Sequence, residues 1–251
     1  MTSAYQTATP FLVGSALSRT WEIMTQAFGK FFALALIPMA PVILLTVLVG
    51  PSSGQTSGQP SGAAMGGLAS ITILLTVVLQ LIAQATIIYG TFQELKGQEF
   101  SIGESLSVGF RRFMPVLGVG LLGWLLIGLA SILLLVPGLI LFCMWYVMVP
   151  VCVIEKPGVW PSLGRSSELT KGCRWQIFGL LILVIIATFL ITFVFEFVAA
   201  LTGSVIIILA VKGLSQVFIV AYGAILAAVV YRDLRMAKEG VDTSKIANIF
   251  T

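Results

Sequence analysis

The feature that most constrains the fold is a series of long apolar runs. They cover residues 31–50, 67–92, 115–136, 138–154, 176–200 and 205–231. A helix needs about 20 apolar residues to cross the hydrocarbon core of a bilayer. Only 10% of the chain is charged, whereas a soluble domain carries about a quarter. We therefore predict an all-α polytopic membrane protein, with one integral membrane domain over residues 1–251 and six transmembrane helices paired as three hairpins.

The basic residues are distributed unevenly among the links between these runs. The links at 51–66, 136–138 and 201–204 carry no charge, and the remaining links carry nearly every Lys and Arg. Because cytoplasmic loops of membrane proteins are enriched in Lys and Arg, we expect both termini and the charged links to be cytoplasmic. An even number of spans satisfies that orientation.

Amphipathic segments precede the odd-numbered runs. In the first two, apolar residues recur at identical offsets along one helical face: Val13, Leu17, Trp21, Met24 and Phe28, then Ile102, Leu106, Phe110, Phe113 and Leu117. Each segment is too short to span a bilayer, so the pattern predicts cytoplasmic interfacial helices at about 11–28 and 101–114. The architecture is then a threefold repeat of one interfacial helix followed by one hairpin.

The third segment, at about 160–172, differs from the first two. Its expected inward face is small and hydroxyl-rich, with Ser162, Ser166, Ser167 and Thr170. This composition favours packing against protein rather than lipid. We expect Arg165 and Glu168, three apart on its outer side, to form a cytoplasmic contact site together with Lys171.

Polar side chains also lie inside the predicted spans. Glu196 and Lys212 are the charges farthest from the cytoplasmic side, and antiparallel helices joined near Gly203 would bring them to similar depths. Four more residues extend this candidate intramembrane polar site: Gln80, Gln84, Thr192 and Gln216. Ionisable residues in a membrane are functional candidates by default. Interhelical hydrogen bonds, a structural Glu196–Lys212 pair or a snorkelling Lys212 explain the same residues without a function.

Several function classes are disfavoured by composition. The chain has no His, which is the usual general base and the commonest metal ligand. Cys143, Cys152 and Cys173 show no CxxC spacing, and no nucleophile–base arrangement is visible. No basic patch alternates with aromatic residues, as a nucleic-acid surface would. We therefore expect no catalytic residues, cofactor, metal or nucleic-acid partner.

The segment "LVPGLILFCMWYVMVPVCVIEKPGVWPSLGRSSELTKGCRWQIFG" and the ending "YRDLRMAKEG" point to a family. They resemble the integral membrane domain of some glycerophosphoryl diester phosphodiesterases and related stand-alone bacterial inner-membrane proteins of unknown function. The resemblance covers most of the chain from about residue 90. The resemblance implies a bacterial inner-membrane location. It implies the membrane domain of such an enzyme without the catalytic domain, because the hydrolase is a soluble barrel that uses His, acidic residues and a metal, and this chain has no His.

Two functions remain open from the sequence. The first is a non-enzymatic membrane scaffold or accessory protein, associated with lipids and with either a protein partner or a second copy of itself. The second is a transporter or lipid-handling protein, with its polar site around Glu196 and Lys212.

Overall fold

The computed structural model describes residues 11–49, 62–98 and 100–239, with no side-chain detail for 45–49 and 62–72. The described chain is all-helical and contains no strand, which confirms the all-α part of the predicted fold. Its helices are α1 (Val13–Gln26), α2 (Phe28–Val49), α3 (Gly62–Leu95), α4 (Ile102–Arg111), α5 (Phe113–Leu133), α6 (Leu135–Met144), α7 (Met148–Ile154), α8 (Val159–Thr170), α9 (Arg174–Leu201) and α10 (Val205–Glu239).

Five stretches are long and apolar enough to cross a membrane. They are Ile73–Leu95, Phe113–Leu133, Leu135–Ile154, Arg174–Leu201 and Val205–Glu239. A sixth is added if α1 and α2, which are bent by 86° at their junction, count together as one broken span. These lengths and compositions are compatible with a multi-pass membrane protein. The short helices α1, α4 and α8 coincide with the three predicted amphipathic segments.

The predicted span at 138–154 is not one continuous helix. A turn at residues 145–147 separates α6 from α7. Pro150 explains the break, because it has no N–H to bond the carbonyl of Tyr146 four residues earlier. The turn between α5 and α6 lies at Leu134 rather than at the predicted 136–138. Pro137 instead sits in the first turn of α6, where its missing N–H costs little.

The buried core lies at the end of the molecule that carries most of the Lys and Arg residues, which we call the basic end. In α10, fully buried residues are concentrated between Val217 and Leu234, whereas Val205, Ile206 and Leu214 are exposed. In α3 the buried residues run from Leu81 to Phe92. Around this core the short helices and the basic ends of the long helices pack together, and the far ends of the long helices extend beyond it as arms.

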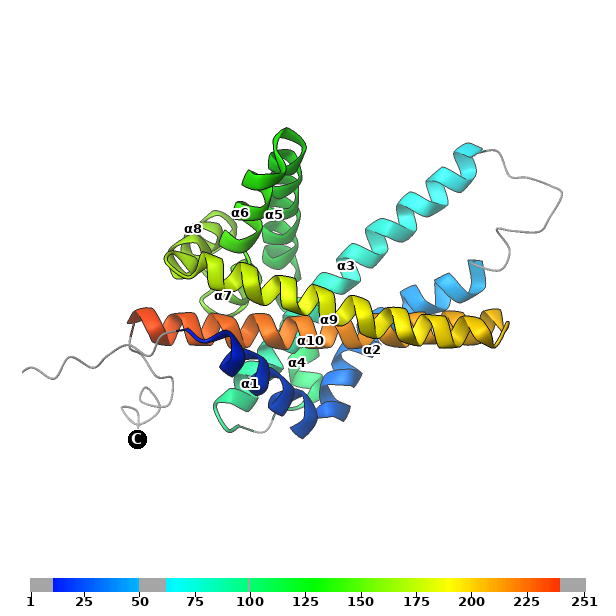
Figure 1. Ribbon diagram of the computed structural model, residues 1–251, viewed down its shortest axis with the longest axis horizontal. Coiled ribbons are helices and arrows are strands. Elements are labelled where there is room, and N and C mark those ends of the chain that lie inside the picture. The colour runs from blue at the N-terminus through cyan, green and yellow to red at the C-terminus, as the bar shows by residue number, and fades with distance from the viewer. Residues whose placement is uncertain (1–10, 50–61, 99, 240–251) are drawn as a thin grey trace, which may run out of the picture.

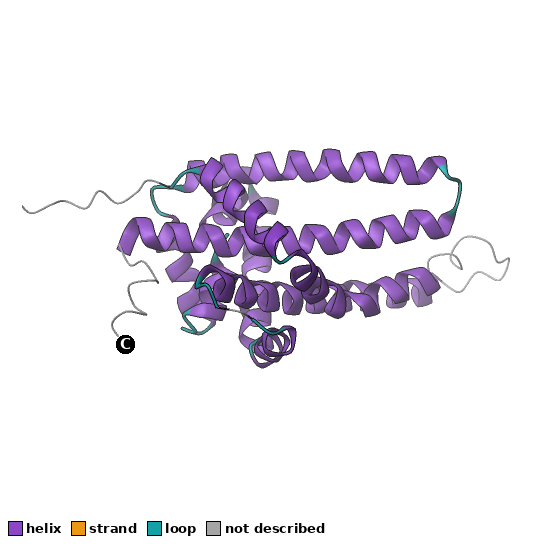
Figure 2. Ribbon diagram, turned by 90° about the horizontal axis from the view of Figure 1, so that it is seen from below, coloured by secondary structure: helices purple, strands orange, loops and turns teal. Residues whose placement is uncertain are grey.

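The arms leave the core in different directions. Figure 1 shows α9 and α10 side by side along the long axis, while α5 and α6 rise away from them and α3 takes a third direction. Seen from below in Figure 2, α9 and α10 form one antiparallel hairpin. The predicted arrangement of three similar hairpins crossing one bilayer therefore remains a prediction, since the α5–α6 hairpin is not parallel to the α9–α10 hairpin here.

Candidate functional site

The short helices dock on the core through small residues. Ala16 and Thr20 of α1, Ser105 of α4, and Ser162, Ser166 and Thr170 of α8 have no exposed surface. Gly109 of α4 is also buried, and a Cβ added there would lie 2.4 Å from Cγ2 of Thr86. Small residues at i and i+4 let helices approach closely. The prediction that the small face of α8 packs against protein is confirmed for Ser162, Ser166 and Thr170, whereas Ser167 is half-buried.

The same register relates all three short helices. Aligned on their small residues, they read "VGSALSRTWE" from Val13, "IGESLSVGFR" from Ile102 and "VWPSLGRSSE" from Val159. The third helix is therefore a regular member of the repeat and not an exception. A comparison of large apolar residues alone does not detect this register in the third helix. The signal that detects it is the small residue that precedes Leu17, Leu106 and Leu163.

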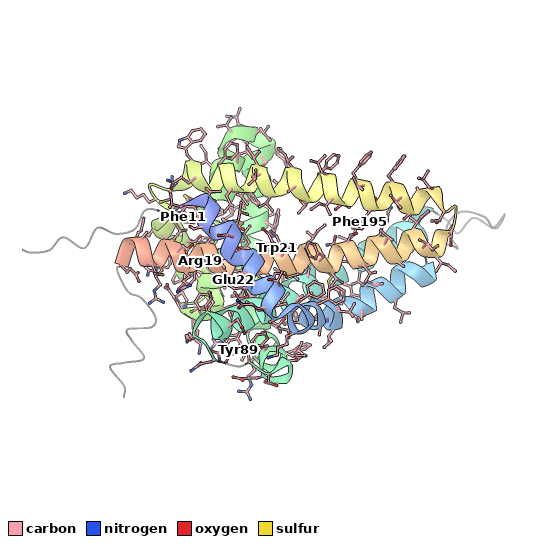
Figure 3. All side chains as sticks on the ribbon, turned by 60° about the horizontal axis from the view of Figure 1, so that its bottom comes forward. Phe11, Arg19, Trp21, Glu22, Tyr89 and Phe195 are labelled. Atoms are coloured by element: carbon pink, nitrogen blue, oxygen red, sulfur yellow. The ribbon has the colours of Figure 1, made fainter. Side chains whose placement is uncertain are left out.

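The register places Arg19 and Arg165 at equivalent positions, and both bind α10. Arg19 Nη1 donates to Asp233 Oδ1 at 3.0 Å. Arg165 Nη2 donates to Glu239 Oε1. Figure 3 shows Arg19 and Trp21 on α1 where that helix crosses α10. In α4 the equivalent residue is Val108, and that helix is held by Tyr89, whose hydroxyl donates to Glu104 Oε1 at 2.7 Å.

Arg165 is the centre of an ion-pair network that joins α7, α8 and α10. Its Nε lies 3.0 Å from Glu155 Oε2, and Tyr231 donates its hydroxyl to Glu155 Oε1 at 2.7 Å. Arg235 Nε contacts Glu239 Oε2 at 2.9 Å. The hydrogen bond to Glu239 raises the pKa of the Arg165 guanidinium above its ordinary value. The network is mostly covered, because the Arg165 side chain is 28% exposed.

This geometry corrects the expected outward position of Arg165. It is directed into the protein, whereas the Glu168 side chain is 75% exposed and Lys171 is exposed. Glu168 Oε2 lies 3.9 Å from Arg165 Nη1, and Lys238 Nζ donates to the Glu168 carbonyl. Of the three predicted contact residues, only Glu168 and Lys171 are therefore free to meet a partner through their side chains.

Hydroxyl groups of α8 also cap the C-terminal end of α6, where the helix breaks. Ser166 Oγ lies 2.9 Å and Thr170 Oγ1 3.1 Å from the carbonyl oxygen of Met144. That carbonyl ends α6 and has no helical N–H to accept from. The small face of α8 therefore serves both close packing and capping.

The predicted intramembrane site is not assembled within this chain. Its members are Gln80, Gln84, Thr192, Glu196, Lys212 and Gln216; Gln80 and Lys212 are exposed and the others are half-buried. Among the described residues, no ion pair joins Glu196 to Lys212 and no hydrogen bond joins any two of the six. The expected pairing of the two charges inside one chain is thus not observed.

A separate pocket of about 410 Å³ lies at the junction of α1 and α2. It is lined by Gln26, Lys30, Glu94 and Gln98, and Lys30 Nζ also lies 5.1 Å from the Phe100 ring centroid. In the part of the chain that the structure describes, no three His, Cys, Asp or Glu residues come together as metal ligands.

No protein-family model matches the chain, and neither a curated protein nor a solved structure was found to be similar to it. The resemblance to the phosphodiesterase membrane domain therefore stays a prediction.

Proposed function

We propose that the chain is a non-enzymatic integral membrane scaffold or accessory protein that associates with anionic lipids at its basic end. The proposed location is a bacterial inner membrane, with both termini in the cytoplasm. In this role the short helices and the ion-pair network form a rigid cytoplasmic layer, and the apolar arms cross the bilayer.

The observation that carries the proposal is that exposed tryptophans and exposed cations both occur on the short helices and directly after them. Trp21, Trp160 and Trp175 are 57%, 68% and 85% exposed. Lys171 lies four residues before Trp175, and it and Arg111 are exposed without an ion pair among the described residues. Tryptophan favours the headgroup level of a bilayer, and Lys and Arg near it attract anionic lipids.

The charged groups of the arms support a scaffold over a transporter. A transporter along the arms requires polar groups that converge on one site, and Glu196 and Lys212 do not meet within the chain. The ion pairs lie instead between α1, α8, α10 and the end of α7, where they fix the helices to one another.

The test is purification in native-lipid discs, with mass spectrometry of the lipids and proteins that remain bound. We expect anionic lipids to be enriched over the bulk membrane, and the enrichment to fall at least twofold in the Arg111→Gln/Lys171→Gln double variant. A Leu125→Ala variant is the control, because Leu125 is exposed on the α5 arm and belongs to neither candidate site.

Other outcomes discriminate between the functions. A stoichiometric protein partner would support the accessory role. One neutral lipid retained through washing and lost in Glu196→Gln would contradict the scaffold and support lipid handling. A lipid profile identical to the bulk membrane with no protein partner would refute the proposal.

A further inference from the structure

Two charges near the end of the α9–α10 hairpin have no partner among the residues that the structure describes. Glu196 is half-buried and Lys212 is exposed, and neither makes an ion pair or hydrogen bond in the described part of the chain. Their surroundings are apolar, with Phe193 58% and Leu214 52% exposed. At about 1.5 Å per residue, both lie roughly 10–14 Å from the turn at Gly203. Unpaired charges are costly at such a depth in a membrane.

The two charges lie on the same side of the hairpin. On α9 the residues Thr188, Thr192, Glu196 and Ala199 form one buried and half-buried stripe, and on α10 the half-buried residues Ile208, Val211 and Ser215 form another. Counting about 100° per residue, Glu196 lies at one edge of its stripe, and Lys212 is displaced from the middle of the α10 stripe by less than a right angle in the same rotational sense. Because the helices are antiparallel, equal senses of rotation bring both side chains to one side.

That side also carries exposed apolar residues. Phe189 and Ile185, seven and eleven residues before Glu196, are 66% and 58% exposed. On α10, Val205 lies seven residues before Lys212 and is 56% exposed, and the half-buried Gln216 lies four residues after it. Residues spaced by four, seven and eleven share one helical face. The face is thus apolar with a carboxylate on one helix and an ammonium group on the other.

We propose that this face of the α9–α10 hairpin is an interface with a second copy of the chain. A twofold axis parallel to the hairpin sets α9 of one copy against α10 of the other. Glu196 then lies opposite the partner's Lys212, and Lys212 opposite the partner's Glu196. Because both charges have similar depths, one rotation forms both ion pairs and leaves neither charge unpaired in the membrane. The charge complementarity of the face with itself is what selects a second copy as its occupant.

The test is copurification of two differently tagged copies from native-lipid discs. Wild-type copies are expected to pair. Glu196→Lys alone gives two cations on the face, and Lys212→Glu alone gives two carboxylates. The amount of each variant that copurifies with a second copy of itself is therefore expected to fall at least tenfold below wild type. Coexpression of the two variants recreates both ion pairs between unlike chains and is expected to restore pairing to within twofold of wild type.

Coexpression of the two variants distinguishes an ion pair between two chains from an ion pair within one chain, because neither variant alone has both Glu196 and Lys212. Glu196→Gln and Lys212→Met provide the milder complementary pair if a reversal prevents folding. Leu214→Ala, on the opposite side of α10, is the control and is expected to leave pairing unchanged. Monomeric wild type, self-pairing reversal variants, or a mixture that stays unpaired would each overturn the interface. The lipid enrichment proposed above does not depend on this result.

Discussion

At the scale of single residues, the basic end depends on Arg165. Replacing it by Met removes the cation shared by Glu155 and Glu239, and Glu155 then keeps only the hydrogen bond from Tyr231. Loss of a charged hydrogen-bond partner in a partly covered site is expected to cost about 1–2 kcal/mol of unfolding free energy. The measurement is a thermal melt in detergent, in which Arg165→Met should unfold at a lower temperature than wild type.

The control for that prediction is Lys171→Met, since Lys171 is exposed and makes no ion pair among the described residues. Adding Glu155→Gln to Arg165→Met should recover part of the loss, because it removes the uncompensated carboxylate. Equal melting temperatures for Arg165→Met and Lys171→Met would mean that the network contributes no stability.

At the scale of elements, docking of the short helices depends on their small faces. Gly109→Ala in α4 places a methyl group 2.4 Å from Cγ2 of Thr86, a buried β-branched side chain with little rotamer freedom. Overpacking of this kind is expected to cost about 1–3 kcal/mol. In the same helix, a Cβ at Gly103 meets only Ser101 Oγ at 3.8 Å, an ordinary contact. A detergent melt should therefore show Gly109→Ala to be less stable than Gly103→Ala, and the reverse order would refute close packing of α4.

The elements were largely predictable from sequence, and their contacts were not. Apolar runs and amphipathic offsets located the long and short helices, because hydrophobic periodicity is a local signal. The network around Arg165 joins residues that are 10, 74 and 76 positions apart, and their proximity depends on how α8 packs across α10. For Glu196 and Lys212 the sequence predicted a contact that is not observed. Similar depth on adjacent helices does not determine whether two side chains meet.

At the scale of the whole molecule, the α5–α6 and α9–α10 hairpins leave the core in different directions. Leu134 at the end of the α5–α6 hairpin is 64% exposed, and Leu201 at the end of α9 is 72% exposed. Both hairpins are apolar and helical, so each satisfies its backbone within the membrane. If both cross in the predicted orientation, these two ends reach the same outer surface, although Figure 1 shows the hairpins pointing in different directions.

Single cysteines test this arrangement. Cys143 and Cys152 are buried, so Cys173→Ser provides a background of low reactivity for Leu134→Cys, Leu201→Cys and Lys171→Cys. In spheroplasts, a membrane-impermeant maleimide is expected to label the first two variants at once and Lys171→Cys only after permeabilisation, since the proposed orientation places the basic end in the cytoplasm. Immediate labelling of Lys171→Cys alone would reverse the orientation. Labelling at Leu201 without Leu134 would mean that α5 and α6 do not cross with α9 and α10, and that the divergence of the arms persists in the membrane.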